Sequence, residues 1–143
     1  VYLNYVAGDD LNKPLVKVLE ESSVERFIPA SVPDLYQEIE GKFQEWYRAN
    51  TGIMWEAPPR KAADIIEASK LDYVILRITW LYDEEGNTHL RVSEKGEPFV
   101  EAQVTRQAVA QFITNLLTGQ EDYHRANLGL GEPGTEYSNP SFY

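Results

Sequence analysis

Residues Pro58–Leu81 read PPRKAADIIEASKLDYVILRITWL, and this stretch decides the fold. Its two prolines suit the first turn of a helix, where no intrahelical N–H bond is lost. Small and apolar residues then recur at i, i+3, i+4 and i+7, which predicts an amphipathic helix of about three turns. These residues are Ala62, Ile65, Ile66 and Ser69. Tyr73–Leu76 is apolar without alternation, as expected of a strand covered by helices on both faces. Together they predict half of a parallel α/β crossover.

The same stretch resembles a known family. Arg60–Ala63, Glu67–Tyr73 and Ile75–Arg77 follow the pattern K-x-x-x-x-x-x-S-G-L-D-Y-T-I-L-R-P of the atypical short-chain dehydrogenases/reductases, the NmrA-like NAD(P)-binding proteins. The resemblance extends from Asn4 to Tyr143 and is strongest between Val24 and Leu117. It implies an α/β fold, namely the C-terminal portion of a Rossmann-like doubly wound parallel sheet with helices on both faces.

The resemblance also implies a function. Members of the family bind NAD or NADP. They would transfer a hydride to a small carbonyl, a quinone or a flavin, with the cofactor supplying the chemistry. A second function stays open, in which the chain is a dinucleotide-binding sensor or interaction protein without catalysis. Fold analogy does not separate the two.

Composition excludes several other classes of protein. The 143 residues are 43% hydrophobic and contain no run of the roughly 20 apolar residues that a membrane span needs. The net charge of −10 disfavours nucleic acid, because no cationic face is available to neutralise phosphates. The absence of cysteine removes disulfides and thiolate chemistry and fits a reducing cytoplasm.

The chain opens in what reads as the middle of a fold. Val1–Val6 has strand composition, and the Ala7-Gly8 turn after it resembles the one that follows the fourth strand of the family sheet. We therefore expect residues 1–119 to be the C-terminal part of an NAD(P)-binding domain, with roughly 60 to 80 residues upstream that carry the glycine-rich phosphate loop. Asn4, Ala7 and Gly8 are then cofactor contacts. An uncovered sheet edge also predicts self-association as a homo-oligomer.

A second strand, Val24–Ser31, resembles the family sequence V-K-R-F-I-F-I-S-S. Ligands of open α/β sheets lie outside the carboxyl ends of the strands, so Ala30 and Ser31 are predicted to face the nicotinamide and the substrate. The resemblance implies that Ser31 hydrogen-bonds a substrate carbonyl. The alternative is a serine that satisfies backbone groups at a strand end.

Residues 32–59 do not continue the alternation of strands and helices, and they contain several large side chains at this ligand edge. A pocket wall or lid is one interpretation, because small-molecule sites are mostly apolar. Plain core over the end of the sheet is the other. The side chains in question are Tyr36, Trp46, Tyr47, Met54 and Trp55.

Lys61 resembles the lysine of the Tyr-x-x-x-Lys pair, which holds the nicotinamide ribose and lowers the pKa of the tyrosine. Four residues earlier this chain has Ala57, so the tyrosine is missing. Tyr36 is predicted as a substitute acid that reaches in from the preceding loop. Lys61 would hold the ribose, unless it is an ordinary solvated lysine.

Arg77 ends an apolar strand and needs a partner, which is either a carboxylate or the cofactor. Ile78 stands where the family has proline. The resemblance places the main chain of Ile78, Thr79 and Trp80 beside the nicotinamide amide.

The remaining elements follow from local patterns. We expect a turn over residues 83–88, strands over 89–93 and 99–104, and a helix from Thr105 to Gly119. Residues 120–143 are rich in turn formers and predict an irregular tail, including Gly129-x-Gly131-x-x-Gly134, which follows no predicted strand. His89 and His124 lack the spacing of metal ligands and are predicted to lie on the surface.

Overall fold

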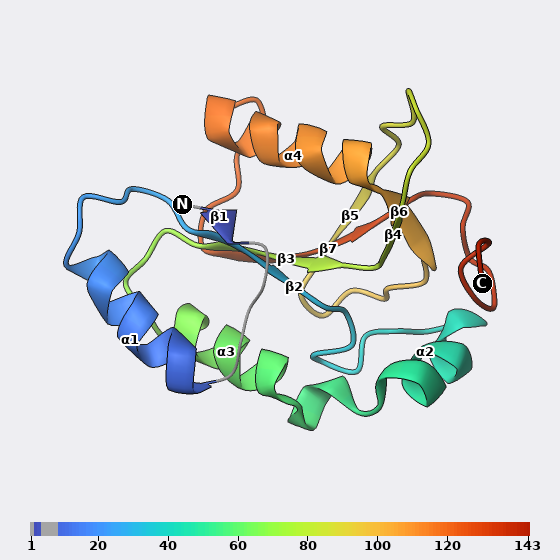
Figure 1. Ribbon diagram of the computed structural model, residues 1–143, viewed down its shortest axis with the longest axis horizontal. Coiled ribbons are helices and arrows are strands. Elements are labelled where there is room, and N and C mark those ends of the chain that lie inside the picture. The colour runs from blue at the N-terminus through green and yellow to red at the C-terminus, as the bar shows by residue number, and fades with distance from the viewer. Residues whose placement is uncertain (1, 4–8) are drawn as a thin grey trace.

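The computed structural model describes residues 2–3 and 9–143, and its centre is a five-stranded sheet with the order β1-β2-β3-β7-β5 (Figure 1). The strands are β1 (Tyr2–Leu3), β2 (Ile28–Ser31), β3 (Val74–Ile78), β5 (Arg91–Glu94) and β7 (Ala126–Gly131). Neighbours run parallel except β5, which is antiparallel to β7. Two short strands, β4 (Trp80–Tyr82) and β6 (Gln103–Thr105), form a separate parallel pair.

Helices cover both faces of this sheet, and the predicted α/β class is thereby confirmed. Helices α1 (Asp9–Glu20) and α3 (Pro58–Glu67) lie on one face and α4 (Arg106–Thr118) on the other, as Figure 1 shows. The short helices α2 (Phe43–Thr51) and η1 (Met54–Glu56) lie in the segment between β2 and α3. Within the described residues, no helix has the length and apolar character needed to cross a membrane.

Strand β3 explains the two layers. Successive side chains of a strand point to opposite faces, so Ile75 packs into the cluster under α1 and α3, while Val74 and Leu76 pack into the cluster under α4. All three side chains are fully buried. The unbroken apolar run that the sequence shows is therefore the pattern of a strand with two buried faces.

The helix that follows β6 has the predicted ends. The side chain of Thr105 accepts a hydrogen bond from the backbone N–H of Ala108 at 3.0 Å, which satisfies one of the first-turn donors. At the other end, Gly119 adopts a left-handed φ of 75° and stops the helix.

The prediction of an irregular tail over residues 120–143 is wrong in one respect. Strand β7 lies within that range and pairs with β3 along five residues, from Val74↔Ala126 to Ile78↔Leu130. The sequence ANLGLG reads as a turn because glycine and asparagine disfavour strands. A domain boundary at residue 119 is therefore wrong too, whereas residues 132–143 contain no helix or strand.

Close packing explains the two glycines of β7. A Cβ atom on Gly129 would lie 2.4 Å from the Ser93 hydroxyl oxygen and 2.6 Å from the Phe99 ring. A Cβ atom on Gly131 would lie 2.4 Å from Cβ of Glu101. The segment between β5 and β6 thus rests directly on the backbone of β7, which only glycine permits.

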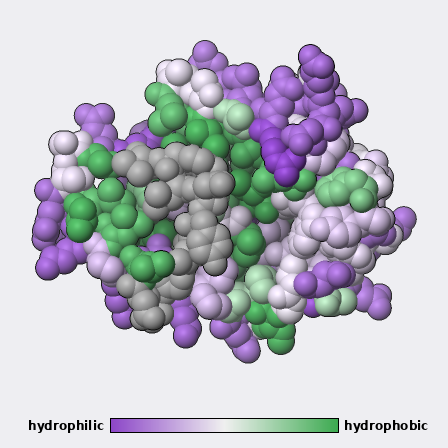
Figure 2. Space-filling model, in the orientation of Figure 1, coloured by the Kyte–Doolittle hydropathy of each residue, from purple (hydrophilic) through white to green (hydrophobic). Residues whose placement is uncertain are grey.

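Other elements differ from the sequence prediction in detail. The predicted strand over residues 99–104 is shorter, because β6 begins at Gln103 and Phe99 forms only an isolated bridge with Ile39. In α1, Leu11 and Val18 are 64% and 62% exposed, while Val16 and Leu19 are buried. Figure 2 shows apolar surface at the end of the molecule that carries α1.

We predict that Gly129→Ala destabilises the fold by roughly 1 to 3 kcal/mol, because the added methyl group must displace the Phe99 ring or the strand itself. Gly86→Ala is the control, since a Cβ there meets no atom within 4 Å and its φ of 81° adds only backbone strain. Urea unfolding of both variants measures the difference. An equal loss in the two would contradict the packing argument.

Candidate functional site

The carboxyl ends of the parallel strands point toward the side of the molecule that holds α2 and the C terminus (right in Figure 1). Strand β2 ends at Ser31, which lies in register with Arg77 near the end of β3. Parallel α/β sheets place their ligands outside this edge.

Ser31 has an unusual hydroxyl group. The residue is half-buried and its oxygen is buried, yet the hydroxyl has no hydrogen-bond partner among the described residues. Buried hydroxyls are normally paired, because an unpaired one loses its bond to water without replacement. The alternative in which Ser31 satisfies backbone groups is therefore not what the structure shows. Ala30, its neighbour, is 7% exposed and serves the core.

Past β3, the three residues predicted to line the nicotinamide have different environments. Thr79 is 4% exposed, and its hydroxyl donates to the backbone oxygens of Glu101 and Ala102, at 3.2 Å each. The ring of Trp80 packs edge-on against Trp46, 5.1 Å between centroids, and Ile78 is half-buried. The side chains of Thr79 and Trp80 are thus held by the protein, and any ligand contact would use the main chain.

Lys61 lies in the first turn of α3, is exposed, and forms no ion pair within the part of the chain that the structure describes. Ala57 is the N-cap of the same helix and supplies no side-chain hydrogen bond. The structure therefore leaves the ammonium group of Lys61 available to a ligand. Asn4, Ala7 and Gly8, the other predicted cofactor contacts, lie outside the described residues.

Tyr36 is held away from this lysine. Its hydroxyl donates to Glu67 at 2.8 Å and accepts from the side-chain amide of Asn127 at 2.7 Å. Glu67 is the last residue of α3 and Lys61 is in its first turn, about 9 Å apart along the helix axis at 1.5 Å per residue. The structure does not bring the hydroxyl of Tyr36 to the lysine.

The electrostatics of Tyr36 also differ from those of a phenol tuned by lysine. Burial, followed by the hydrogen bond to Glu67, raises its pKa well above the ordinary value of 10.0. Three cations surround the ring without reversing that direction. They are Arg60 at 4.8 Å, Arg77 at 5.7 Å and Lys95 at 4.2 Å from its centroid. The phenol stays protonated, which suits a hydrogen-bond donor and not a base.

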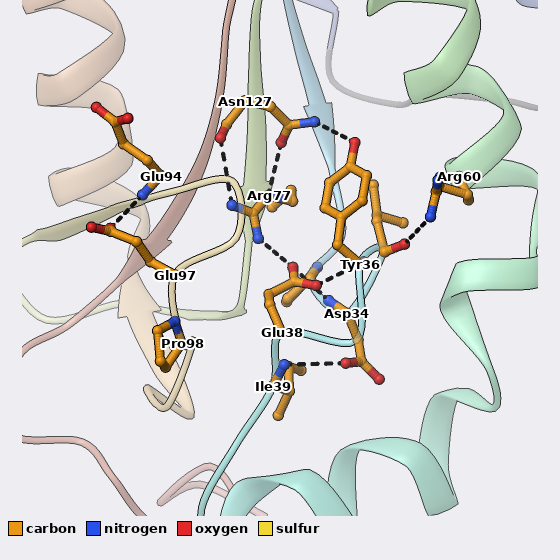
Figure 3. A network of polar contacts seen from close by, with 12 residues as sticks. Asp34, Tyr36, Glu38, Ile39, Arg60, Arg77, Glu94, Glu97, Pro98 and Asn127 are labelled. Atoms are coloured by element: carbon orange, nitrogen blue, oxygen red, sulfur yellow. Dashed lines mark hydrogen bonds and ion pairs between the residues drawn. The ribbon is translucent and has the colours of Figure 1, made fainter.

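Arg77 has the carboxylate partner that the sequence left open. It is completely buried, pairs with Glu38, and donates from Nε to the side-chain oxygen of Asn127 at 2.8 Å (Figure 3). The interpretation of Arg77 as one half of a structural ion pair is confirmed. Sequence reasoning missed Glu38 and Asn127, because nothing in their local pattern signals a partner 39 or 50 residues away.

The large side chains of residues 32–59 divide between core and surface. Tyr47 is 1% exposed, and its hydroxyl donates to the backbone oxygen of Pro33 at 2.9 Å. It belongs to a buried cluster with Ile39, Phe43 and Phe99, so for Tyr47 the core interpretation is confirmed. Trp46, Met54 and Trp55 are half-buried, and their role as a pocket wall stays a prediction.

The structure contains other polar features away from this edge. A cavity of about 510 Å³ lies at the amino ends of β3 and β7 and includes Glu67, Lys95 and Asn127 in its lining. His89 and His124 are exposed as predicted. Within the described residues, no group of His, Cys, Asp and Glu side chains is arranged to hold a metal ion.

Comparisons with known proteins show the family and the fold of this chain. The family described as NAD(P)H-binding matches residues 2–120. A short-chain dehydrogenase/reductase from Veillonella parvula DSM 2008, solved in complex with NADP, is 33% identical, with a TM-score of 0.90. The match covers 99% of this chain and 66% of that protein. Among curated proteins, none matches the chain.

Two further solved structures share the fold. A Rossmann-fold NAD(P)-binding family protein from Shigella flexneri is 31% identical, has a TM-score of 0.72, and is matched over 100% of this chain and 64% of its own. An anaerobilin reductase from Escherichia coli O157:H7 is 19% identical with a TM-score of 0.60, over 86% of this chain and 57% of its own, which shows the fold alone. The chain thus spans between 57% and 66% of the length of these proteins.

The stability that Glu67 contributes should depend on pH. Burial alone would raise its pKa, but hydrogen bonds from Lys95, Asn127 and Tyr36 outweigh burial and lower the pKa below the usual 4.5. A carboxylate with a lowered folded-state pKa stabilises the fold above its unfolded pKa, and that stability is lost as the pH falls through the folded value. Glu67→Gln should therefore cost roughly 1 to 3 kcal/mol at pH 7, and the difference from wild type should shrink below pH 4.5.

Urea unfolding across this pH range measures the difference, with Glu85→Gln in the exposed turn as the control. A gap between wild type and Glu67→Gln that stays constant from neutral to acid pH would show that the charge of Glu67 contributes nothing.

Proposed function

The chain belongs to the NAD(P)H-binding family of Rossmann-fold proteins related to short-chain dehydrogenases/reductases, and we propose that it forms the C-terminal, substrate-side part of an NAD(P)-dependent oxidoreductase. The observation that carries this proposal is the unpaired hydroxyl of Ser31 at the carboxyl end of β2. A buried hydroxyl without a partner at the ligand edge of such a sheet is suited to bond a ligand oxygen.

The residues at this edge fit a dinucleotide in chemical terms. Lys61 offers an exposed ammonium group to the hydroxyls of a ribose. The main chain of Ile78, Thr79 and Trp80, with Ala30 next to Ser31, would line the nicotinamide pocket. Asn4, Ala7 and Gly8, which lie outside the described residues, stay predicted cofactor contacts. When bound, NAD or NADP supplies the hydride.

The hydride acceptor that we propose is a small carbonyl, a quinone or a flavin. We also propose that the chain belongs to the NmrA-like group of atypical short-chain dehydrogenases/reductases. In this proposal Ser31 donates a hydrogen bond to the acceptor oxygen as negative charge develops there. Tyr36 as the acid stays a prediction: its raised pKa keeps the proton on the phenol, but Glu67 and Asn127 hold the hydroxyl. A cytoplasmic location and self-association are proposed on the sequence grounds given above.

One observation favours a second function, a dinucleotide-binding sensor without catalysis. Ala57 replaces the tyrosine of the usual pair, and Tyr36 is tied to the far end of α3. Such a protein would keep the cofactor contacts and transfer no hydride. The NADP-bound relative is consistent with both functions.

A paired experiment separates the two. Calorimetric titration with NADPH and NADH measures binding, and the absorbance of the reduced nicotinamide reports turnover with a quinone, a flavin and a small aldehyde in turn. Binding with turnover supports the oxidoreductase. Binding without turnover on any acceptor supports the sensor, and failure of the intact protein to bind either nucleotide overturns both.

Lys61→Ala should raise the KM for the cofactor by about 10- to 100-fold and leave kcat nearly unchanged. With Ala57 in place of a tyrosine, Lys61 has no phenol to tune at that position, so it contributes binding that is equal in ground and transition states. Lys70→Ala, an exposed lysine just after the same helix, is the control. A matching fall in kcat at saturating cofactor would show that Lys61 assists proton transfer.

Ser31→Ala should separate stability from function. Removing an unpaired buried hydroxyl costs the fold little or stabilises it slightly, while the acceptor loses a hydrogen bond, so kcat/KM should fall by about 10-fold or more. Thermal unfolding and steady-state kinetics on the same sample test this. Unchanged kcat/KM would remove Ser31 from the site, and a marked loss of stability would mean that its hydroxyl is paired in the protein.

A further inference from the structure

The segment that follows Ser31 has a strained backbone. Asp34 and Gln37 adopt φ values of 65° and 61°, in the left-handed region that residues other than glycine rarely adopt. Such conformations persist only where the surroundings determine them. We call residues 32–39 the edge loop, because they leave the sheet at the carboxyl end of β2.

Two buried carboxylates fix the edge loop (Figure 3). Glu38, whose side chain is 2% exposed, accepts the backbone N–H groups of Asp34 at 3.0 Å and Tyr36 at 2.8 Å. Asp34 in turn accepts the backbone N–H of Ile39 at 3.2 Å and an ion pair from Arg48 at 2.7 Å. The loop thus folds around its own acidic side chains.

Arg77 compensates the charge of the buried Glu38 carboxylate. A carboxylate removed from water is strongly unfavourable unless a cation and hydrogen bonds replace its hydration. The guanidinium of Arg77 pairs with Glu38 and is itself oriented by Asn127 of β7. The strand that supplies the cation is also the neighbour of β2, with Arg77 directly in register with Ser31.

We propose that Arg77 and Glu38 are positioning residues. Their ion pair holds the edge loop in its strained conformation, so that Ser31 and the edge loop beside it are preformed for the ligand. This inference rests on the proposed function of the same edge. It also assigns residues 32–39 a fixed role, in place of a lid that closes on binding. The wider lid expectation for residues 32–59 then concerns only the part after the edge loop.

The physical consequence lies in binding. If the pair is lost, the edge loop populates conformations that do not bind, and the apparent affinity falls by the fraction that remains competent. A preformed loop avoids the entropy cost of ordering when the ligand arrives. Once the ligand is bound and the loop is ordered, the chemical step is the same, so kcat should change little.

Glu38→Gln in the full protein tests the proposal, because it keeps the shape of the side chain, removes its charge, and replaces one acceptor oxygen by a donor. We expect amide hydrogen exchange in residues 32–39 to accelerate by at least about 10-fold and the Kd for NADPH to rise about 10- to 100-fold, with kcat nearly unchanged. Asp72→Asn is the control, since its carboxylate also pairs with an arginine, Arg26 at 3.5 Å, but is 30% exposed and lies before the amino end of β3.

A double variant, Arg77→Leu with Glu38→Leu, covers the case in which Glu38→Gln does not fold. It leaves no uncompensated buried charge and still removes the ion pair together with the two backbone hydrogen bonds that Glu38 accepts. Faster exchange confined to residues 32–39 together with weaker NADPH binding supports the proposal. Uniformly faster exchange across the sheet, or a loosened loop with unchanged Kd, overturns it. If the wild-type protein binds no NADPH, the proposed function is refuted. The exchange data then test only whether the ion pair holds the edge loop.

Discussion

The constraint on which this structure depends is the burial of β3 on both faces. Its side chains alternate between the layer under α1 and α3 and the layer under α4, and Val74, Ile75 and Leu76 are fully buried. A strand so placed requires a paired neighbour on each side and a helix on each face. Strand β2 supplies one neighbour and β7 the other, so the single apolar run accounts for the central place of β3 in the sheet.

The one charged residue of that strand organises the ligand edge. Arg77 is as deeply buried as its apolar neighbours and therefore needs a carboxylate. Glu38 meets this need from the segment after β2, and Asn127 from β7. Three elements far apart in the chain are thereby joined by one buried cation. Local order at the site is a consequence of compensating one buried charge.

Family membership and the geometry of the site contribute different things to the functional argument. Membership shows an NAD(P)H-binding fold. The geometry shows two available groups, an unpaired serine hydroxyl and an exposed lysine, whereas the hydroxyl of Tyr36 is already bonded to Glu67. Because Ala57 stands four residues before Lys61, this chain has no phenol at that position of α3.

The sequence by itself determined the α/β class, the α3–β3 unit, and both ends of α4, because these depend on periodicity and on capping residues within a few positions. It also indicated that Arg77 needs a partner. Only the tertiary structure decided that the partner is Glu38, that ANLGLG is a central strand, and that Tyr36 bonds Glu67. The physical reason is range. The glycines of β7 are chosen by contacts with Ser93, Phe99 and Glu101, and the environment of Tyr36 by residues 31 and 91 positions away, which no local pattern encodes.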